Sequence, residues 1–190
     1  MESNIKESNI KESKDPYFTK QILTYMGNKR KFIEPLNNIL LKLEKTLKKP
    51  RGELLIGEGF SGSGILSRLF KTHASNLFTN DIAGYSKTLN RCYLSNILDC
   101  DKEKINKLID AANNFVDNEN ENYEKFISVY WSDFGEKNTK SSRSYFTEEN
   151  AIRIDKYMHF IKNKTHKSIQ YYLLAPLLVE CSMHNNTNGQ

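Results

Sequence analysis

Apolar residues along the chain follow two spacings, one typical of helices and one typical of short strands. Intervals of three and four residues predict a helix over Phe32–Leu47, and Pro50 and Gly52 are expected to end it. Lysines near the end of this helix interact favourably with the negative pole of the helix dipole. The apolar run Leu54–Ile56 leads directly into glycines and predicts a buried parallel strand.

The same order of elements then repeats. Helical spacing over Ile65–Phe70 follows the glycines, and Leu77–Thr79 is a second short apolar run. A further helix is expected through Tyr85–Tyr93. An order of strand, helix, strand and helix predicts an α/β fold with a parallel sheet.

Beyond residue 100 the pattern is mostly helical, and no second set of strands is evident. Asp133–Ser144 is polar and predicts a loop, after which Thr147 with Asn150 is expected to open a helix. Pro176 is expected to bend the last apolar segment. The predicted helical segments are Ile105–Ala112, Phe126–Tyr130, Ile154–Ile161 and Tyr171–Cys181.

Composition places the chain among globular proteins. It has 190 residues, of which 38% are hydrophobic and 27% charged, which suits one soluble domain. No apolar stretch approaches the roughly 18 residues of a membrane helix, and the start of the chain has no secretory signal, so we expect a cytoplasmic protein with no membrane partner. The net charge of +5 suits a nucleic-acid partner, although charge alone favours a mildly basic soluble protein over a nucleic-acid-binding one.

Cysteine and histidine are too scattered to predict a metal site. No two of them have the spacing of zinc ligands, so we expect no metal and only reduced cysteines. The residues concerned are Cys92, Cys100, Cys181, His73, His159, His166 and His184.

The segment Glu58–Gly64 joins the first predicted strand to a helix. Its glycines allow a tight turn and let a ligand approach the backbone. The free N–H groups of the following helix suit a carboxylate, and an acidic residue at the strand end suits an ammonium group. An amino acid carries both of these charges.

Asp81 comes seventeen residues after Gly64, at the end of the second predicted strand. A carboxylate in this place accepts hydrogen bonds from ribose hydroxyls. The two strand ends together therefore predict a site for an adenosine joined to an amino acid, which describes S-adenosylmethionine. The glycines do not follow the G-x-G-x-x-G order of dinucleotide sites, and Gly64 is not followed by the Lys-Ser/Thr of a P-loop. A glycine turn without a ligand is the remaining alternative.

Three motifs in this order resemble the Dam-like family of adenine-N6 DNA methyltransferases. They are Tyr25-Met26-Gly27-Asn28-Lys29, Glu58-Gly59-Phe60-Ser61-Gly62-Ser63-Gly64 and Asn80-Asp81-Ile82. The resemblance continues more weakly through Tyr145–Ala151 with Asp155, Tyr171–Leu174 and Asn185–Gly189, so it spans about residue 17 to the end. It implies a partial Rossmann-like methyltransferase fold, double-stranded DNA as the partner and S-adenosylmethionine as the cofactor.

The resemblance also implies roles for particular residues. Tyr25, Gly27 and Lys29 would border the methionine end of the cofactor. Glu58, Phe60, Gly62 and Gly64 would form the cofactor loop. Asp81 would hold the ribose, and Ile82 would lie against the adenine.

The family's reaction needs an Asp-Pro-Pro-Tyr motif, which accepts the hydrogens of the adenine amino group and stacks on the flipped base. No such motif occurs in the 190 residues. Asp15-Pro16-Tyr17 has one proline and precedes the cofactor loop, so it more simply marks the start of an element. We therefore expect no catalytic residue in this chain, which is interpreted as the N-terminal portion of a truncated or split enzyme.

These observations divide the chain into three parts. Residues 1–16 repeat Glu-Ser-Asn-Ile-Lys and predict a disordered tail. Residues 17–100 form the cofactor-binding α/β part, and residues 101–190 form a helical region that leads toward the missing catalytic half. Besides a methyltransferase portion inactive alone, two alternatives stay open: a non-catalytic cofactor- or DNA-binding fragment that complements a second chain, and an unstable remnant. Trp131, Lys137, Lys140 and Arg143 could contact DNA, but a solvated loop accounts for them better.

Overall fold

The computed structural model describes residues 15–20, 22–23, 29–96, 101–118, 121–132 and 144–185. It divides into two compact units. One takes in Met1–Ile22 and Gly27–Leu94, and the other Leu23–Met26 and Ser95–Gln190. Each unit is described by itself.

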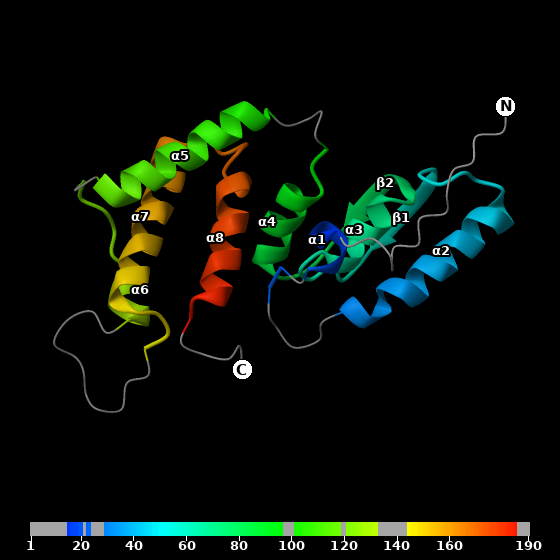
Figure 1. The fold of residues 1–190 in the computed structure, drawn as a ribbon, viewed down its shortest axis with the longest axis horizontal. Helices are drawn as coiled ribbons and strands as arrows, with labels where there is room; N and C mark the ends of the chain where they lie inside the picture. Colours follow the sequence, from blue (N-terminus) through cyan, green and yellow to red (C-terminus); the bar gives the residue numbers. More distant parts are fainter. Residues whose placement is uncertain are drawn as a thin grey trace. The chain divides into compact units, whose positions relative to one another are not determined.

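The first unit is the α/β part, and its sheet consists of two parallel strands (Figure 1). Strand β1 pairs with β2 from Leu54 opposite Ala74 to Glu58 opposite Thr79. The predicted α/β class and parallel strands are therefore confirmed. The elements are α1 (Pro16–Thr19), the 3₁₀ turn η1 (Arg30–Phe32), α2 (Ile33–Leu47), β1 (Leu54–Glu58), α3 (Ile65–Lys71), β2 (Ala74–Thr79) and α4 (Gly84–Tyr93).

One face of this sheet carries the core of the unit. Leu40 of α2, Leu54 of β1 and Leu69 of α3 are buried together. Each such leucine contributes roughly 1.5–3 kcal/mol. On the opposite face Leu55 is 71% exposed and Phe78 66% exposed. The prediction of a fully buried first strand is thus wrong for Leu55, because no other described element of this unit covers that face.

Helix α2 confirms the predicted helix, and its buried face includes polar residues. Asn37, Leu40 and Glu44 are buried. Four apolar residues that share the helical spacing are exposed instead: Phe32, Ile39, Leu43 and Leu47. The reason lies in His73, which gives the two polar side chains a buried partner.

The second unit is helical. Helix α7 contacts α5, α6 and α8, and Phe115, Phe160 and Leu173 belong to its buried core. Thr147 caps α7 by accepting a hydrogen bond from the Asn150 N–H at 3.3 Å, as the sequence predicted. The elements are α5 (Lys102–Asn118), α6 (Ile127–Trp131), α7 (Glu148–Lys164) and α8 (Tyr171–Met183), which continues through Pro176.

Several predictions fall outside the described residues. They concern the tail up to residue 14, Cys100 and most of the loop from Asp133 to Ser144. Asp15 is described, and its side chain caps α1 through the Tyr17 N–H. Within the described ranges, no helix is long and apolar enough to cross a membrane.

Candidate cofactor site

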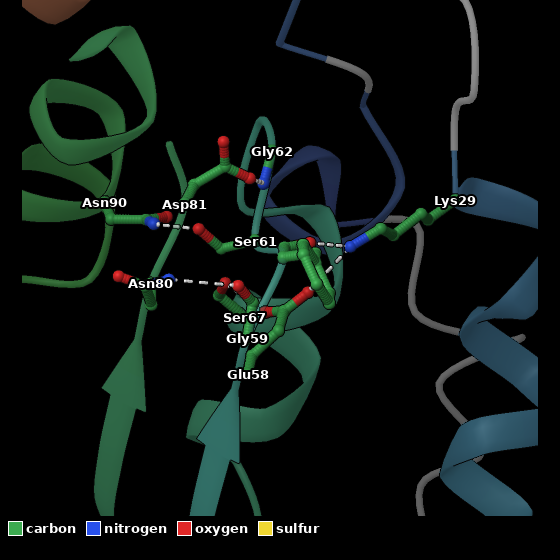
Figure 2. A network of polar contacts seen from close by, with 10 residues as sticks. Lys29, Glu58, Gly59, Ser61, Gly62, Ser67, Asn80, Asp81 and Asn90 are labelled. Atoms are coloured by element: carbon green, nitrogen blue, oxygen red, sulfur yellow. Dashed lines mark hydrogen bonds and ion pairs between the residues drawn. The ribbon is translucent and has the colours of Figure 1, made fainter. Parts of the chain in front are cut away.

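The candidate site lies at the carboxyl ends of β1 and β2, where the polypeptide leaves each of the two strands. The Asn80 N–H donates to the Glu58 carbonyl at 2.8 Å, and the Ser61 N–H donates to the Asn80 carbonyl at 2.9 Å. The Asn80 side-chain amide also donates to the Gly59 carbonyl at 3.3 Å. The loop Glu58–Gly64 is therefore held directly against the end of β2 (Figure 2).

Asp81 lies at the end of β2, and both of its carboxylate oxygens accept hydrogen bonds from backbone N–H groups. Its Oδ1 accepts from the Ala83 N–H at 2.9 Å, and its Oδ2 accepts from the Gly62 N–H at 2.8 Å. Donation by the N–H groups of Ala83 and then Gly62 lowers the pKa of Asp81. Asp81 thus presents a carboxylate at the strand end, beside the glycine loop.

Glu58 is a buried carboxylate with two donors. The Ser67 hydroxyl of α3 donates to its Oε2 at 2.5 Å, and the Lys29 Nζ lies 3.4 Å from its Oε1. Lys29 also donates to the Phe60 carbonyl. Burial raises the pKa of Glu58, and the bonds from Ser67 and Lys29 oppose that shift. The end of β1 therefore holds a buried carboxylate that pairs with an ammonium group.

Space and apolar surface lie around these polar groups. No atom lies within 4 Å of the position that a Cβ on Gly59 would take. Phe60 is 81% exposed, and Ile82 is fully exposed next to Asp81. The loop cluster therefore combines open backbone, a carboxylate and exposed apolar side chains.

The structure brings together most of the residues that the sequence singled out. Lys29 contacts Glu58 and the backbone of Phe60, and Gly62 contacts Asp81. Gly64 is the N-cap residue of α3, and its N–H donates to the Ser61 carbonyl at 2.9 Å. Ile82, the residue after Asp81, is exposed to solvent. Tyr25 and Gly27 lie outside the described residues.

Sequence reasoning missed three polar residues that support the loop: Ser61, Ser67 and Asn90. Ser61 and Ser67 are buried, and Asn90 reaches Ser61 from α4. Small polar residues inside glycine loops and helices carry no distinctive spacing. Only the fold, which places α4 beside the loop, identifies them. Among the described residues there is no cluster of three or more His, Cys, Asp or Glu that could hold a metal ion.

Comparison with known proteins identifies the family of this chain. Residues 25–190 match the family model described as D12 class N6 adenine-specific DNA methyltransferase. The chain therefore belongs to this family, and the resemblance found in its motifs is confirmed. DNA methyltransferases of this type use S-adenosylmethionine as methyl donor.

A curated relative gives the same family and a measure of coverage. The chain is 30% identical over 138 residues to the Type II methyltransferase M.NlaIII of Neisseria lactamica. The aligned part covers 67% of this chain and 36% of the relative, so the chain spans about a third of that protein's length. No solved structure matches the chain.

Proposed function

We propose that this chain is the cofactor-holding portion of a site-specific DNA adenine-N6 methyltransferase and binds S-adenosylmethionine at the loop Glu58–Gly64 and Asp81. The observation that carries the proposal is the hydrogen bond between the Gly62 N–H and the Asp81 carboxylate. It joins the glycine loop of one strand end to the acid of the next. This is the juxtaposition that a cofactor with an adenosine and an amino-acid end requires.

Each group has a role that follows from its chemistry. The Asp81 carboxylate accepts hydrogen bonds from the ribose hydroxyls, and the exposed Ile82 side chain packs against the adenine. Glu58 and Lys29 provide opposite charges for the amino-acid end, beside the N-terminus of α3. The cofactor, when bound, supplies the methyl group. Tyr25 and Gly27 are proposed to border the same end, as the family motif implies.

Calorimetric titration of the full 190-residue chain with S-adenosylhomocysteine tests this proposal. Removal of the ribose acceptor by Asp81→Ala should weaken binding at least about tenfold, because a hydrogen bond to a charged group contributes about 1.5–3 kcal/mol. Asp110→Ala removes an exposed carboxylate from α5 and serves as the control. Equal affinity of the Asp81→Ala variant and the wild type would contradict the assignment of Asp81 to the cofactor site.

The same proposal holds that this chain alone transfers no methyl group to DNA. Its one partial match to the catalytic motif is Asp15-Pro16-Tyr17, in which Asp15 already accepts the Tyr17 N–H as the cap of α1. A helix cap of this kind does not present a carboxylate to a base. Incorporation of a radioactive methyl group into adenine-containing duplex DNA by the purified chain would contradict this part of the proposal.

A second candidate function is that of a fragment which complements another polypeptide. Within the described part of the first unit, β1 pairs only with β2, and Leu55 and Phe78 are exposed on one sheet face. Exposed sheet edges and apolar faces favour pairing with further chain. A third strand added beside β1 would extend the sheet toward a Rossmann-like fold. Co-expression with a family polypeptide that carries Asp-Pro-Pro-Tyr should yield a complex that methylates duplex DNA, and recovery of two separate inactive chains would argue against it.

A further inference from the structure

Helix α4 reaches the cofactor loop through one buried side chain, Asn90. Asn90 is 8% exposed, and its Nδ2 donates to the Ser61 hydroxyl oxygen at 2.8 Å. Ser61 is 1% exposed and lies in the middle of the loop, directly before Gly62. Figure 2 shows the Asn90 amide pointing from α4 toward Ser61.

The other atom of the same amide limits what the loop can carry at Gly64. A Cβ on Gly64 would lie 2.5 Å from the Asn90 Oδ1, which is well inside van der Waals contact. Gly64 also has φ of 76°, in the left-handed region that side chains disfavour. Asn90 therefore bonds to the centre of the loop through Ser61, and its Oδ1 occupies the space that a side chain at Gly64, the N-cap of α3, would need.

Helix α4 is tied to the loop at its other end as well. It begins at Gly84, three residues after Asp81, whose carboxylate accepts the Gly62 N–H. Asp81 thus bonds to Gly62 from the segment that leads into α4, and Asn90 bonds to Ser61 from within the helix. Two neighbouring loop residues are in this way held by α4 and by the segment directly before it.

We propose that Asn90 is a positioning residue for the cofactor, an inference that rests on the proposed function. By holding Ser61, Asn90 keeps Gly62 at the place where its N–H meets Asp81, and so keeps the ribose-binding carboxylate in register with the loop. Asn90 does this without contacting the cofactor. Its neighbour Leu89, which is fully buried, supplies the packing of α4.

Titration of the full chain with S-adenosylhomocysteine tests the proposal. Asn90→Ala should weaken binding at least about tenfold, which corresponds to about 1.4 kcal/mol. Ser61→Ala removes the same hydrogen bond from the loop side with loss of a single oxygen, and should weaken binding similarly. Lys87→Ala changes an exposed residue of the same helix and should bind like the wild type.

A double-mutant cycle separates positioning from a purely structural role. If Asn90 acts through the register of Asp81, the losses from Asn90→Ala and Asp81→Asn should be non-additive in affinity, since both remove the same ribose contact. Additive losses would overturn the proposal. Wild-type affinity in the Asn90→Ala variant would also overturn the proposal. If Asn90→Ala does not fold, wild-type affinity in the folded Ser61→Ala variant would overturn it instead.

Failure of the proposed function gives a different result. If the wild-type chain itself does not bind S-adenosylhomocysteine, the cofactor site is wrong and the role of Asn90 falls with it. If the wild type binds S-adenosylhomocysteine and the Asn90→Ala and Ser61→Ala variants bind it as tightly as the wild type does, only the positioning role is wrong.

Discussion

Glu58 is a residue whose environment disfavours its charged form. It is buried at the end of β1, and burial raises its pKa above the ordinary value of 4.5. A carboxylate with a raised folded-state pKa favours folding when it is protonated, and that contribution is lost as the pH rises through the folded-state pKa. Such a cost to stability at neutral pH is typical of a group kept for binding.

Replacement of the charge should therefore stabilise the unliganded chain. We expect Glu58→Gln to raise the free energy of unfolding at pH 7, because the amide still offers an oxygen to Ser67 but carries no charge to desolvate. The gain should shrink as the pH falls through the raised folded-state pKa, because protonation then removes the charge of the wild-type carboxyl. Urea denaturation followed by far-ultraviolet circular dichroism at a series of pH values measures this.

Glu53→Gln is the matched control, since Glu53 is exposed just before the same strand. It should leave the free energy of unfolding nearly unchanged at every pH. Glu58→Gln should also bind S-adenosylhomocysteine more weakly if Glu58 serves the amino-acid end. A less stable Glu58→Gln variant at pH 7 would show that the bonds from Lys29 and Ser67 outweigh the cost of burial.

At the scale of elements, the way α2 attaches to the sheet explains what the sequence could and could not predict. Hydrophobic spacing predicted the limits of the helix, because periodicity depends only on local order. It did not predict that Asn37 and Glu44 would be buried while Ile39 and Leu43 stay exposed. The partner that buries them is His73, 29 residues beyond Glu44 in the chain, and no local pattern contains that contact.

The same distinction applies to the candidate site. Glycines, strand ends and an acid at a fixed spacing follow from the connection between strand and helix, so the loop and Asp81 were predictable. The bond from Asn90 to Ser61 joins residues 29 positions apart and depends on how α4 packs. Exposure of Leu55 was equally unpredictable, because an apolar strand gives no sign of which face lacks a neighbour.

The buried contact between α2 and His73 should contribute measurably to stability. His73 is fully buried, with its Nδ1 2.7 Å from Glu44 Oε1 and its Nε2 3.0 Å from Asn37 Oδ1. Glu44→Ala leaves the imidazole N–H without its acceptor, which costs about 1–3 kcal/mol. Amide hydrogen exchange in β1 and α2 should show this loss of protection.

Two variants frame that measurement. Glu44→Gln keeps an oxygen acceptor and should lose less protection than Glu44→Ala. Lys45→Ala alters the exposed side of the same helix and should lose little. Amide hydrogens in β1 could instead be protected equally in Glu44→Ala and Lys45→Ala. That result would mean that the apolar contacts of Leu40, Leu54 and Leu69 hold α2 in place without the buried polar contacts to His73.

At the scale of the whole molecule, the positive charge is unevenly divided along the sequence. Residues 1–94 contain 16 Lys and Arg against 9 Asp and Glu, a net charge of +7. Residues 95–190 contain 12 against 14, a net charge of −2, and the two values add to the +5 of the chain. A polyanion such as duplex DNA would therefore be attracted chiefly to the part that carries the cofactor loop.

Helix α2 and the residues after it hold an exposed group of these cations, including Lys42, Lys45 and Lys49. If the proposed DNA partner is correct, a variant with all three changed to Gln should bind duplex DNA more weakly. Each lost phosphate contact should also reduce the slope of log K against log salt concentration by about 0.9, so three contacts reduce it by about 2.7.

A variant with Lys102, Lys104 and Lys167 changed to Gln removes the same charge from residues 95–190 and should keep most of the slope. Fluorescence anisotropy with a labelled duplex at several salt concentrations measures both variants. Equal reductions of the slope in the two variants would show that only net charge matters. A larger reduction of the slope in the Lys102, Lys104 and Lys167 variant would assign DNA contact to the helical unit despite its net negative charge.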